Sequence, residues 1–200
     1  MRFQSKNLCT ASIAIAITSA AGLTSGCVPI LIGSGVAGGG YVAAREKDLG
    51  DSITDTKLGT LIGGRLYKVS QKLYSEVSVM VDEGVVILTG IVSNPEWVTI
   101  AEKEAWAVKG VKAVENCLKY GQELTPAQIA KDTWLTTKCK TVLLATKGVS
   151  SINYKIKTVD CVVYIKGSAK SAAERQLVID AVKGISSVKK VVSFIKIVNR

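Results

Sequence analysis

The sequence repeats itself, most visibly in DTKLGT, residues 55–60, which returns as DTWLTT, residues 132–137, an offset of 77 residues. Further on, AVKGV at 107–111 returns as AVKGI at 181–185, at an offset of 74 because the first copy holds three extra residues. A repeat of about 70 residues is too long for a solenoid unit and fits a duplicated small domain.

Both copies show the same order of predicted elements. The Asp-Thr pair that begins each copy is typical of a helix N-cap, and apolar residues follow it at helical spacing. A period of two then predicts two strands, which Asp82-Glu83-Gly84 joins in the first copy as a tight turn. The predicted segments are helices from Asp55 and Asp132, strands around 77–81, 85–91, 152–156 and 161–166, second helices over 94–109 and 170–183, and last strands over 111–119 and 186–198.

The order helix, strand, strand, helix, strand restricts the topology. A strand–helix–strand crossover should be right-handed and should place the last strand parallel to its partner. Gly110 and Gly184 are expected to end the second helices as C-cap residues. The predicted fold class is therefore α+β, with two tandem αββαβ units, each a three-stranded mixed sheet covered by two helices on one face.

The N-terminal residues differ in character from the repeats. MRFQSKN is basic, and residues 8–23 carry no charge, which is typical of a secretory signal peptide. Sixteen uncharged residues are fewer than the roughly 20 that span a membrane, although an uncleaved N-terminal anchor is an alternative. Thr24-Ser25-Gly26-Cys27 resembles the bacterial lipobox, with Leu23 one place earlier than usual. The resemblance implies that Cys27 is lipidated, carrying diacylglycerol and an acyl chain such as palmitate.

These segments divide the chain into four parts. We expect a lipoprotein signal peptide over residues 1–26, an apolar Gly-rich tether over 27–50, and domains over 51–121 and 126–200. Val28 follows the cysteine, at a position where Asp would be typical of a lipoprotein that is not sorted to the outer membrane. The resemblance therefore implies an outer-membrane lipoprotein that faces the periplasm.

The charge is distributed unevenly between the copies. From residue 27 to 124, 10 Lys and Arg oppose 12 Asp and Glu, whereas from 125 to 200, 14 oppose 4. A requirement of the fold would affect both copies, so the basic second copy points to an anionic partner. The plainer alternative is a solvated basic face that keeps the protein soluble. Export disfavours nucleic acid as the partner.

The sequence lacks the residues that several kinds of catalytic and metal site require. There is no His in the chain, which excludes His-based triads and His metal ligands. No CxxC spacing occurs, so we expect no metal site and no cofactor, and Cys117, Cys139 and Cys161 are expected as buried thiols, with one disulfide as an alternative. Residues 33–38 match GxGxxG, but they follow Cys27 rather than a strand, which disfavours a nucleotide site. We therefore expect no enzyme and no small-molecule substrate.

The tandem units, the DTWLTTK segment at 132–138 and the closing AVKGISSVKKV at 181–191 resemble the BON (bacterial OsmY and nodulation) domain. With the lipobox, the chain resembles the dual-BON outer-membrane lipoproteins of the division- and outer-membrane-stress-associated lipid-binding family. The resemblance implies a non-catalytic module that binds phospholipid and supports envelope integrity.

The helix over 170–183 is the predicted contact with anionic phospholipid. On a helical wheel, Val178, Ile179 and Val182 cluster toward the sheet. An apolar stripe, formed by Ala173, Leu177 and Ala181, lies on the opposite side. Glu174 and Asp180 flank that stripe and favour shallow contact. The predicted lipid-binding residues are Trp134, Lys170, Ala173, Leu177, Ala181, Lys183, Lys189 and Lys190. The alternative is a protein-interaction scaffold for envelope or division proteins, without lipid contact beyond the anchor.

Overall fold

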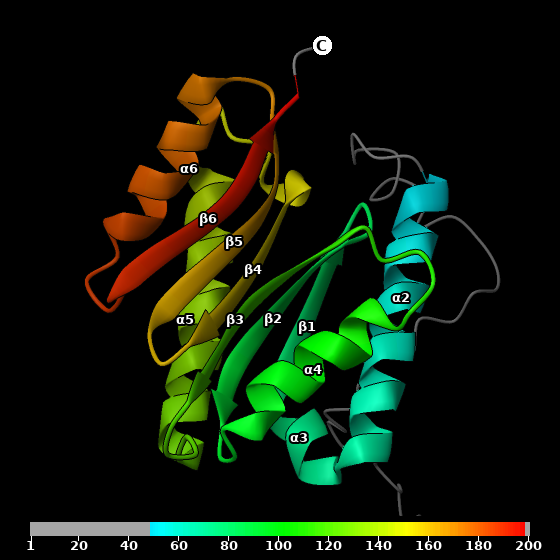
Figure 1. Cartoon of the computed structure of the whole chain (residues 1–200). Coiled ribbons are helices and arrows are strands. Elements are labelled where there is room, and N and C mark those ends of the chain that lie inside the picture. The colour runs from blue at the N-terminus through cyan, green and yellow to red at the C-terminus, as the bar shows by residue number, and fades with distance from the viewer. Residues whose placement is uncertain (1–48, 199–200) are drawn as a thin grey trace, which may run out of the picture. The chain divides into compact units, whose positions relative to one another are not determined.

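The computed structural model of the chain describes residues 49–198, with side chains from residue 54 on, and all of these belong to one compact unit. Residues 1–48, including Cys27 and nearly all of the predicted tether, lie outside the described residues. The described part contains two successive αββαβ units (Figure 1).

Each unit forms one three-stranded mixed sheet, as predicted. The first unit contains α2 (Leu49–Val69), α3 (Gln71–Glu76), β1 (Val77–Asp82), β2 (Val85–Val92), α4 (Glu96–Trp106) and β3 (Ala113–Tyr120). The second contains α5 (Pro126–Ala145), a 3-10 turn η1 (Ser151–Asn153), β4 (Tyr154–Val159), β5 (Val162–Ala169), α6 (Ala172–Lys183) and β6 (Lys190–Ile197). The strand orders are β1-β2-β3 and β4-β5-β6, antiparallel in the first pair of each and parallel in the second.

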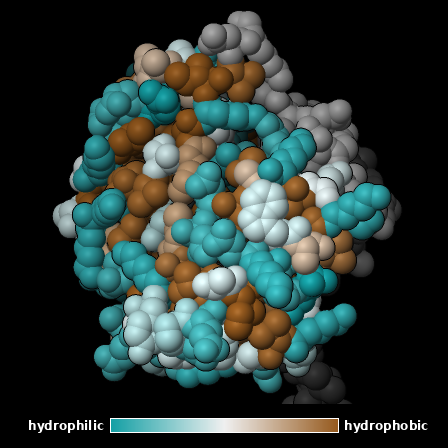
Figure 2. Space-filling view, viewed as in Figure 1, coloured by the Kyte–Doolittle hydropathy of each residue, from teal (hydrophilic) through white to brown (hydrophobic). Residues whose placement is uncertain are grey.

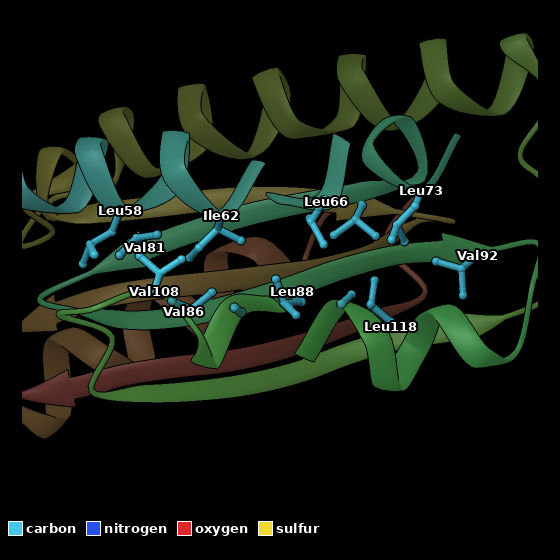
Figure 3. Packing of buried hydrophobic residues seen from close by; sticks show 13 residues of the cluster. Leu58, Ile62, Leu66, Leu73, Val81, Val86, Leu88, Val92, Val108 and Leu118 are labelled. Carbon is cyan, nitrogen blue, oxygen red and sulfur yellow. The ribbon is translucent and has the colours of Figure 1, made fainter. Parts of the chain in front are cut away.

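One face of each sheet forms a core with its helices. In the first unit, Leu58, Ile62 and Leu66 of α2 point toward Val81 and Leu88 of the sheet (Figure 3). In the second, buried residues of α5 and α6, including Leu135, Leu143 and Val178, pack with the corresponding strand residues. Each fully buried Leu or Ile contributes about 1.5–3 kcal/mol. The predicted two-helix cover on one face is confirmed.

The opposite faces of the two sheets pack against each other. Tyr164 and Phe194 of the second sheet belong to a cluster with Met80, Ile91 and Cys117 of the first. Leu124, from the linker between the units, packs on the same cluster. Neither sheet therefore leaves its second face wholly to solvent.

The N-cap prediction for Asp55 and Asp132 is wrong. α2 begins six residues before Asp55, and α5 begins at Pro126 with Thr125 as its N-cap, in a capping box with Gln128. Both aspartates are buried inside their helices. Pro126 suits the first helical turn because its missing N–H has no partner to lose there.

The two aspartates instead bind the hairpin turn of their own unit. Asp55 accepts hydrogen bonds from the backbone N–H groups of Glu83 (2.8 Å) and Gly84 (2.9 Å). Asp132 accepts from those of Asp160 (2.7 Å) and Cys161 (2.8 Å). The Asp-Thr repeat therefore fixes the opening helix against the hairpin rather than starting the helix.

Smaller differences concern the ends of the second helices. α6 begins at Ala172, with Ser171 as its N-cap, so Lys170 precedes the helix. Gly184 is its C-cap residue but has a right-handed φ of −68°, and Gly110 lies four residues beyond the end of α4. The C-cap prediction is therefore confirmed for Gly184 and wrong for Gly110, which has a positive φ of 105° but follows Ala107, the C-cap residue of α4.

Candidate functional site

The outer surface of α5 combines an aromatic ring with lysines. Trp134 is 52% exposed, and Lys138 Nζ lies 4.9 Å from the centre of its ring. Lys131 is also exposed on this helix, whose only acidic residue, Asp132, is buried against the hairpin. This surface therefore offers cations and an amphipathic ring without exposed carboxylates of its own helix, which suits an anionic interface.

Two of the three residues of the predicted apolar stripe of α6, Ala173 and Leu177, are exposed. Leu177 is 45% exposed and Ala173 is exposed, while Ala181 is partly buried against the core. Val178 and Val182 are fully buried, as the helical wheel predicted. A Cβ at Gly148, in the loop after α5, would lie 3.7 Å from Leu177, so the stripe lies next to the C-terminal end of α5.

The structure exposes two apolar residues of α5 that the sequence did not single out, Ile129 at 53% and Leu144. Leu144, near the end of α5, is 75% exposed. It follows Leu143, which is buried, and a run of adjacent leucines does not reveal which one faces solvent. A helical wheel drawn through the buried residues Leu135, Cys139 and Leu143 places Leu144 outside the buried arc. This holds whether the helix begins at Pro126 or at Asp132, so the sequence did contain a signal.

The predicted lysines differ in their surroundings. Lys183 and Lys190 are exposed, and within residues 54–198 neither forms an ion pair. Lys189 Nζ instead donates a hydrogen bond to Asp160 Oδ1 at 2.9 Å, and this bond raises the pKa of Lys189. Lys189 is therefore paired within the protein, at the β4–β5 turn, and is less available to an outside partner than Lys183 and Lys190.

Glu174 does not flank the stripe as predicted, because its side chain is buried at 5% exposure. It accepts hydrogen bonds from the backbone N–H groups of Ser150 (3.1 Å) and Lys170 (2.8 Å) and from the Tyr154 hydroxyl (2.8 Å). Burial by itself would raise the pKa of Glu174, but these hydrogen bonds outweigh it and lower the pKa. Glu174 therefore fastens the start of α6 to the core, and Lys170 is held close to the same carboxylate.

Two lysines of the second unit are directed to acids of the first. Lys155 Nζ lies 3.5 Å from Asp82 Oδ1 and 3.6 Å from Asp55 Oδ2, and it also donates to the Val81 carbonyl. Lys196 forms an ion pair with Glu83. The excess of basic residues in the second unit therefore has an internal use as well, and the exposed lysines of α5 and α6 are those available to an outside partner.

Figure 2 shows hydrophilic and apolar residues interspersed on the viewed face rather than one continuous apolar area. Among the described residues, no helix has the length and apolarity to cross a bilayer. The arrangement suits contact at the level of headgroups.

The three cysteines of the described residues are free thiols. Cys139 is buried, and burial raises the pKa of its thiol to about 11. Burial also raises the pKa of Cys117. Both thiols are consequently poor nucleophiles at neutral pH. No group of three or more Cys, Asp or Glu among residues 54–198 is arranged to hold a metal ion.

Comparison with known proteins identifies the class. The BON domain family model matches residues 54–122 and 131–199, and the chain belongs to this family. It is 30% identical over 172 residues to the outer membrane lipoprotein DolP of Haemophilus influenzae, covering 86% of this chain and 88% of that protein. It is 30% identical over 156 residues to osmotically-inducible protein Y of Escherichia coli, covering 76% and 78%. An uncharacterized protein in the gshII 5' region of Anaplasma centrale is 36% identical over 138 residues, covering 66% and 91%.

Proposed function

We propose that the protein is a non-catalytic, outer-membrane lipoprotein facing the periplasm, whose second BON domain binds anionic phospholipid and supports envelope integrity. The observation that carries the proposal is the outer surface of α5 and α6, where Trp134, Leu144 and Leu177 are exposed among lysines. The similarity to an outer membrane lipoprotein over most of both chains supports the location.

Within this surface, we favour α5 over α6 as the main lipid contact. The exposed charged residues of α5 are all lysines, whereas α6 also exposes the acidic residue Asp180. Trp134 sits beside Lys138 on α5, and aromatic residues prefer the interface between headgroups and acyl chains. We therefore place the main lipid contact on α5, with Leu177 of α6 and the predicted lysines around it as the second part.

Vesicle co-sedimentation of residues 46–200 tests the lipid contact. We expect binding to vesicles that contain phosphatidylglycerol, little binding to neutral vesicles, and weaker binding at high salt. Each lysine near an anionic surface contributes about 1 kcal/mol, so Lys131→Glu with Lys138→Glu should lower the affinity about 100-fold or more. Leu177→Glu places a charge in the apolar stripe and should also abolish most binding.

The matched control has the same change in charge on the first domain. Lys103→Glu with Lys109→Glu replaces two exposed lysines there and should leave most of the vesicle binding intact. If both pairs lose affinity equally, the attraction depends on net charge alone. If Leu177→Glu and the α5 pair both bind like the parent, the scaffold function replaces the lipid-binding one.

The membrane anchor is tested separately. We expect the mature protein to begin at Cys27 with a thioether-linked diacylglycerol, because the TSGC sequence follows a basic and then an uncharged segment. Two or more acyl chains hold a protein stably on a membrane. Mass spectrometry of the N-terminal peptide checks this directly, and Cys27→Ala should release the protein from the membrane fraction. Detection of an intact Met1 in the mature protein would contradict the proposal.

A further inference from the structure

A cleft of about 550 Å³ lies beside α5, on a different side from Trp134. Residues of α5 and β4 form one wall, and residues from the end of α3, the start of β1, the last part of β2 and the linker form the other. Its volume lies within the usual range of small-molecule sites. The cleft therefore has room for a ligand considerably larger than a single water molecule.

Two lysines in the cleft have no partner in the described structure. Lys140 of α5 and Lys157 of β4 both line it, and within residues 54–198 neither forms a hydrogen bond or an ion pair. They reach it from different elements, a helix and an edge strand. Two ammonium groups that meet at one cavity favour a bound anion.

The acids that line the cleft are already engaged. Both oxygens of Asp132 accept turn N–H groups, and Glu76 accepts from the backbone N–H of Ser93 at 2.9 Å. Lys72 Nζ lies 3.2 Å from Glu123 Oε2 and 3.7 Å from Glu76 Oε1. Each of these acids therefore has a donor of the protein close by, although Glu76 Oε1 accepts no hydrogen bond within the described residues, whereas Lys140 and Lys157 pair with no acid there.

Hydroxyl groups complete the lining. The hydroxyls of Thr136 and Thr158 are 2.9 Å apart, so one donates to the other and the second keeps a hydrogen for a ligand. Ser78 lines the same cleft from β1. Ammonium and hydroxyl donors around one cavity match the oxygens of a phosphate group, which accept several hydrogen bonds at once.

We propose that this cleft binds a phosphate group of an organic phosphate, with Lys140 and Lys157 as its ion-pair partners. The ligand is held without being turned over, and the cleft is separate from the exposed surface of Trp134 and Leu177. The same chemical group occurs in a free glycerol phosphate and in a phospholipid headgroup, and two arms of one experiment distinguish these sources.

Titration of the full chain in non-ionic detergent with glycerol 3-phosphate, followed by ³¹P NMR line broadening at constant ionic strength, tests the site. We expect saturable binding with a dissociation constant of about 1 mM or lower. A charge-assisted hydrogen bond contributes about 1.5–3 kcal/mol, so Lys140→Ala and Lys157→Ala should each weaken binding about tenfold or more. Lys103→Ala, which changes an exposed lysine of the first domain outside both the cleft and the proposed lipid-binding surface, is the matched control.

The variants also distinguish the source of the phosphate. If Lys140→Ala and Lys157→Ala lower vesicle binding together with glycerol 3-phosphate binding, the cleft takes a lipid headgroup. If the two variants lower only the binding of glycerol 3-phosphate, the ligand of the cleft is a water-soluble phosphate. No saturation by about 10 mM ligand, or equal loss in all three variants, overturns the site. Neither result bears on the lipid-binding proposal, which depends on Leu177 and the α5 pair Lys131 and Lys138.

Discussion

Gly167→Ala is expected to unfold the second domain, or to destabilise it by about 4 kcal/mol or more, without changing any charge. Gly167 lies in β5 opposite Tyr154 at the start of β4. A Cβ at this position would lie 2.2 Å from the carbonyl oxygen of Asn153 and 2.8 Å from the Tyr154 ring. Because the first obstacle is backbone, the overlap is relieved only by separating the strands.

The first domain has the same device. Gly90 occupies the matching position in β2, and a Cβ there would lie 2.1 Å from the carbonyl oxygen of Glu76. Gly90 also has a φ of +153°, which side chains rarely adopt. The close approach brings the segment before each edge strand directly over the middle strand, so both copies need a residue without a Cβ.

Gly64→Ala is the matched control for this prediction. Gly64 lies inside α2, and a Cβ there meets nothing within 4 Å. Alanine in a helix interior is favoured over glycine by about 0.5–1 kcal/mol, so this variant should be slightly more stable than the parent. Hydrogen exchange measured by mass spectrometry separates the domains. Unchanged protection of β4, β5 and β6 in Gly167→Ala would show that the strands accommodate the methyl group.

The duplicated fold was predictable because its signals are local and occur twice. Alternating residues in β1 and β4, the turn at Glu83-Gly84 and the helical spacing after Asp55 are all visible within short windows of sequence. The parallel closing strands then followed from the handedness of crossovers. Repetition also made each weak prediction stronger, since a chance pattern would not recur at a fixed offset.

The role of the two aspartates was not predictable from a short window. Asp-Thr before an amphipathic run is typical of an N-cap, but the N–H groups that Asp55 binds lie 28 and 29 residues away. A signal did exist, because Asp132 precedes the equivalent turn by the same 28 and 29 residues. Only the folded hairpin shows that this constant spacing is a contact.

The proposed lipid-binding surface could be predicted only in outline. Leu177 and the inward residues of α6 follow from periodicity, but the number of lysines alone does not show which are available. Lys155 and Lys196 pair with the first domain, and Lys189 pairs with Asp160, through contacts distant in sequence. The availability of each charge is therefore a property of the tertiary structure.

Asp132→Ala is expected to destabilise the second domain by about 3–5 kcal/mol, because it removes two charge-assisted hydrogen bonds to the β4–β5 turn. Asp132 is 6% exposed, and the N–H of Cys161 that it binds is buried. The loss therefore leaves a buried donor without its acceptor. Asp132→Asn keeps one acceptor oxygen and should cost roughly half as much.

The turn itself increases the effect. Asp160 and Cys161 both have positive φ, at 47° and 60°, in a type of turn that usually carries glycine. The carboxylate of Asp132 holds both residues in this conformation, so its removal also releases backbone strain of about 1 kcal/mol or more per residue, which favours opening of the hairpin. Asp180→Ala is the control, since the exposed side chain of Asp180 accepts a hydrogen bond only from Gln176 among residues 54–198. Urea unfolding of variants that also carry Trp97→Phe and Trp106→Phe, which leave Trp134 as the sole tryptophan of the sequence, measures the difference by fluorescence. A loss no larger for Asp132→Ala than for Asp180→Ala would mean that the turn forms without the carboxylate.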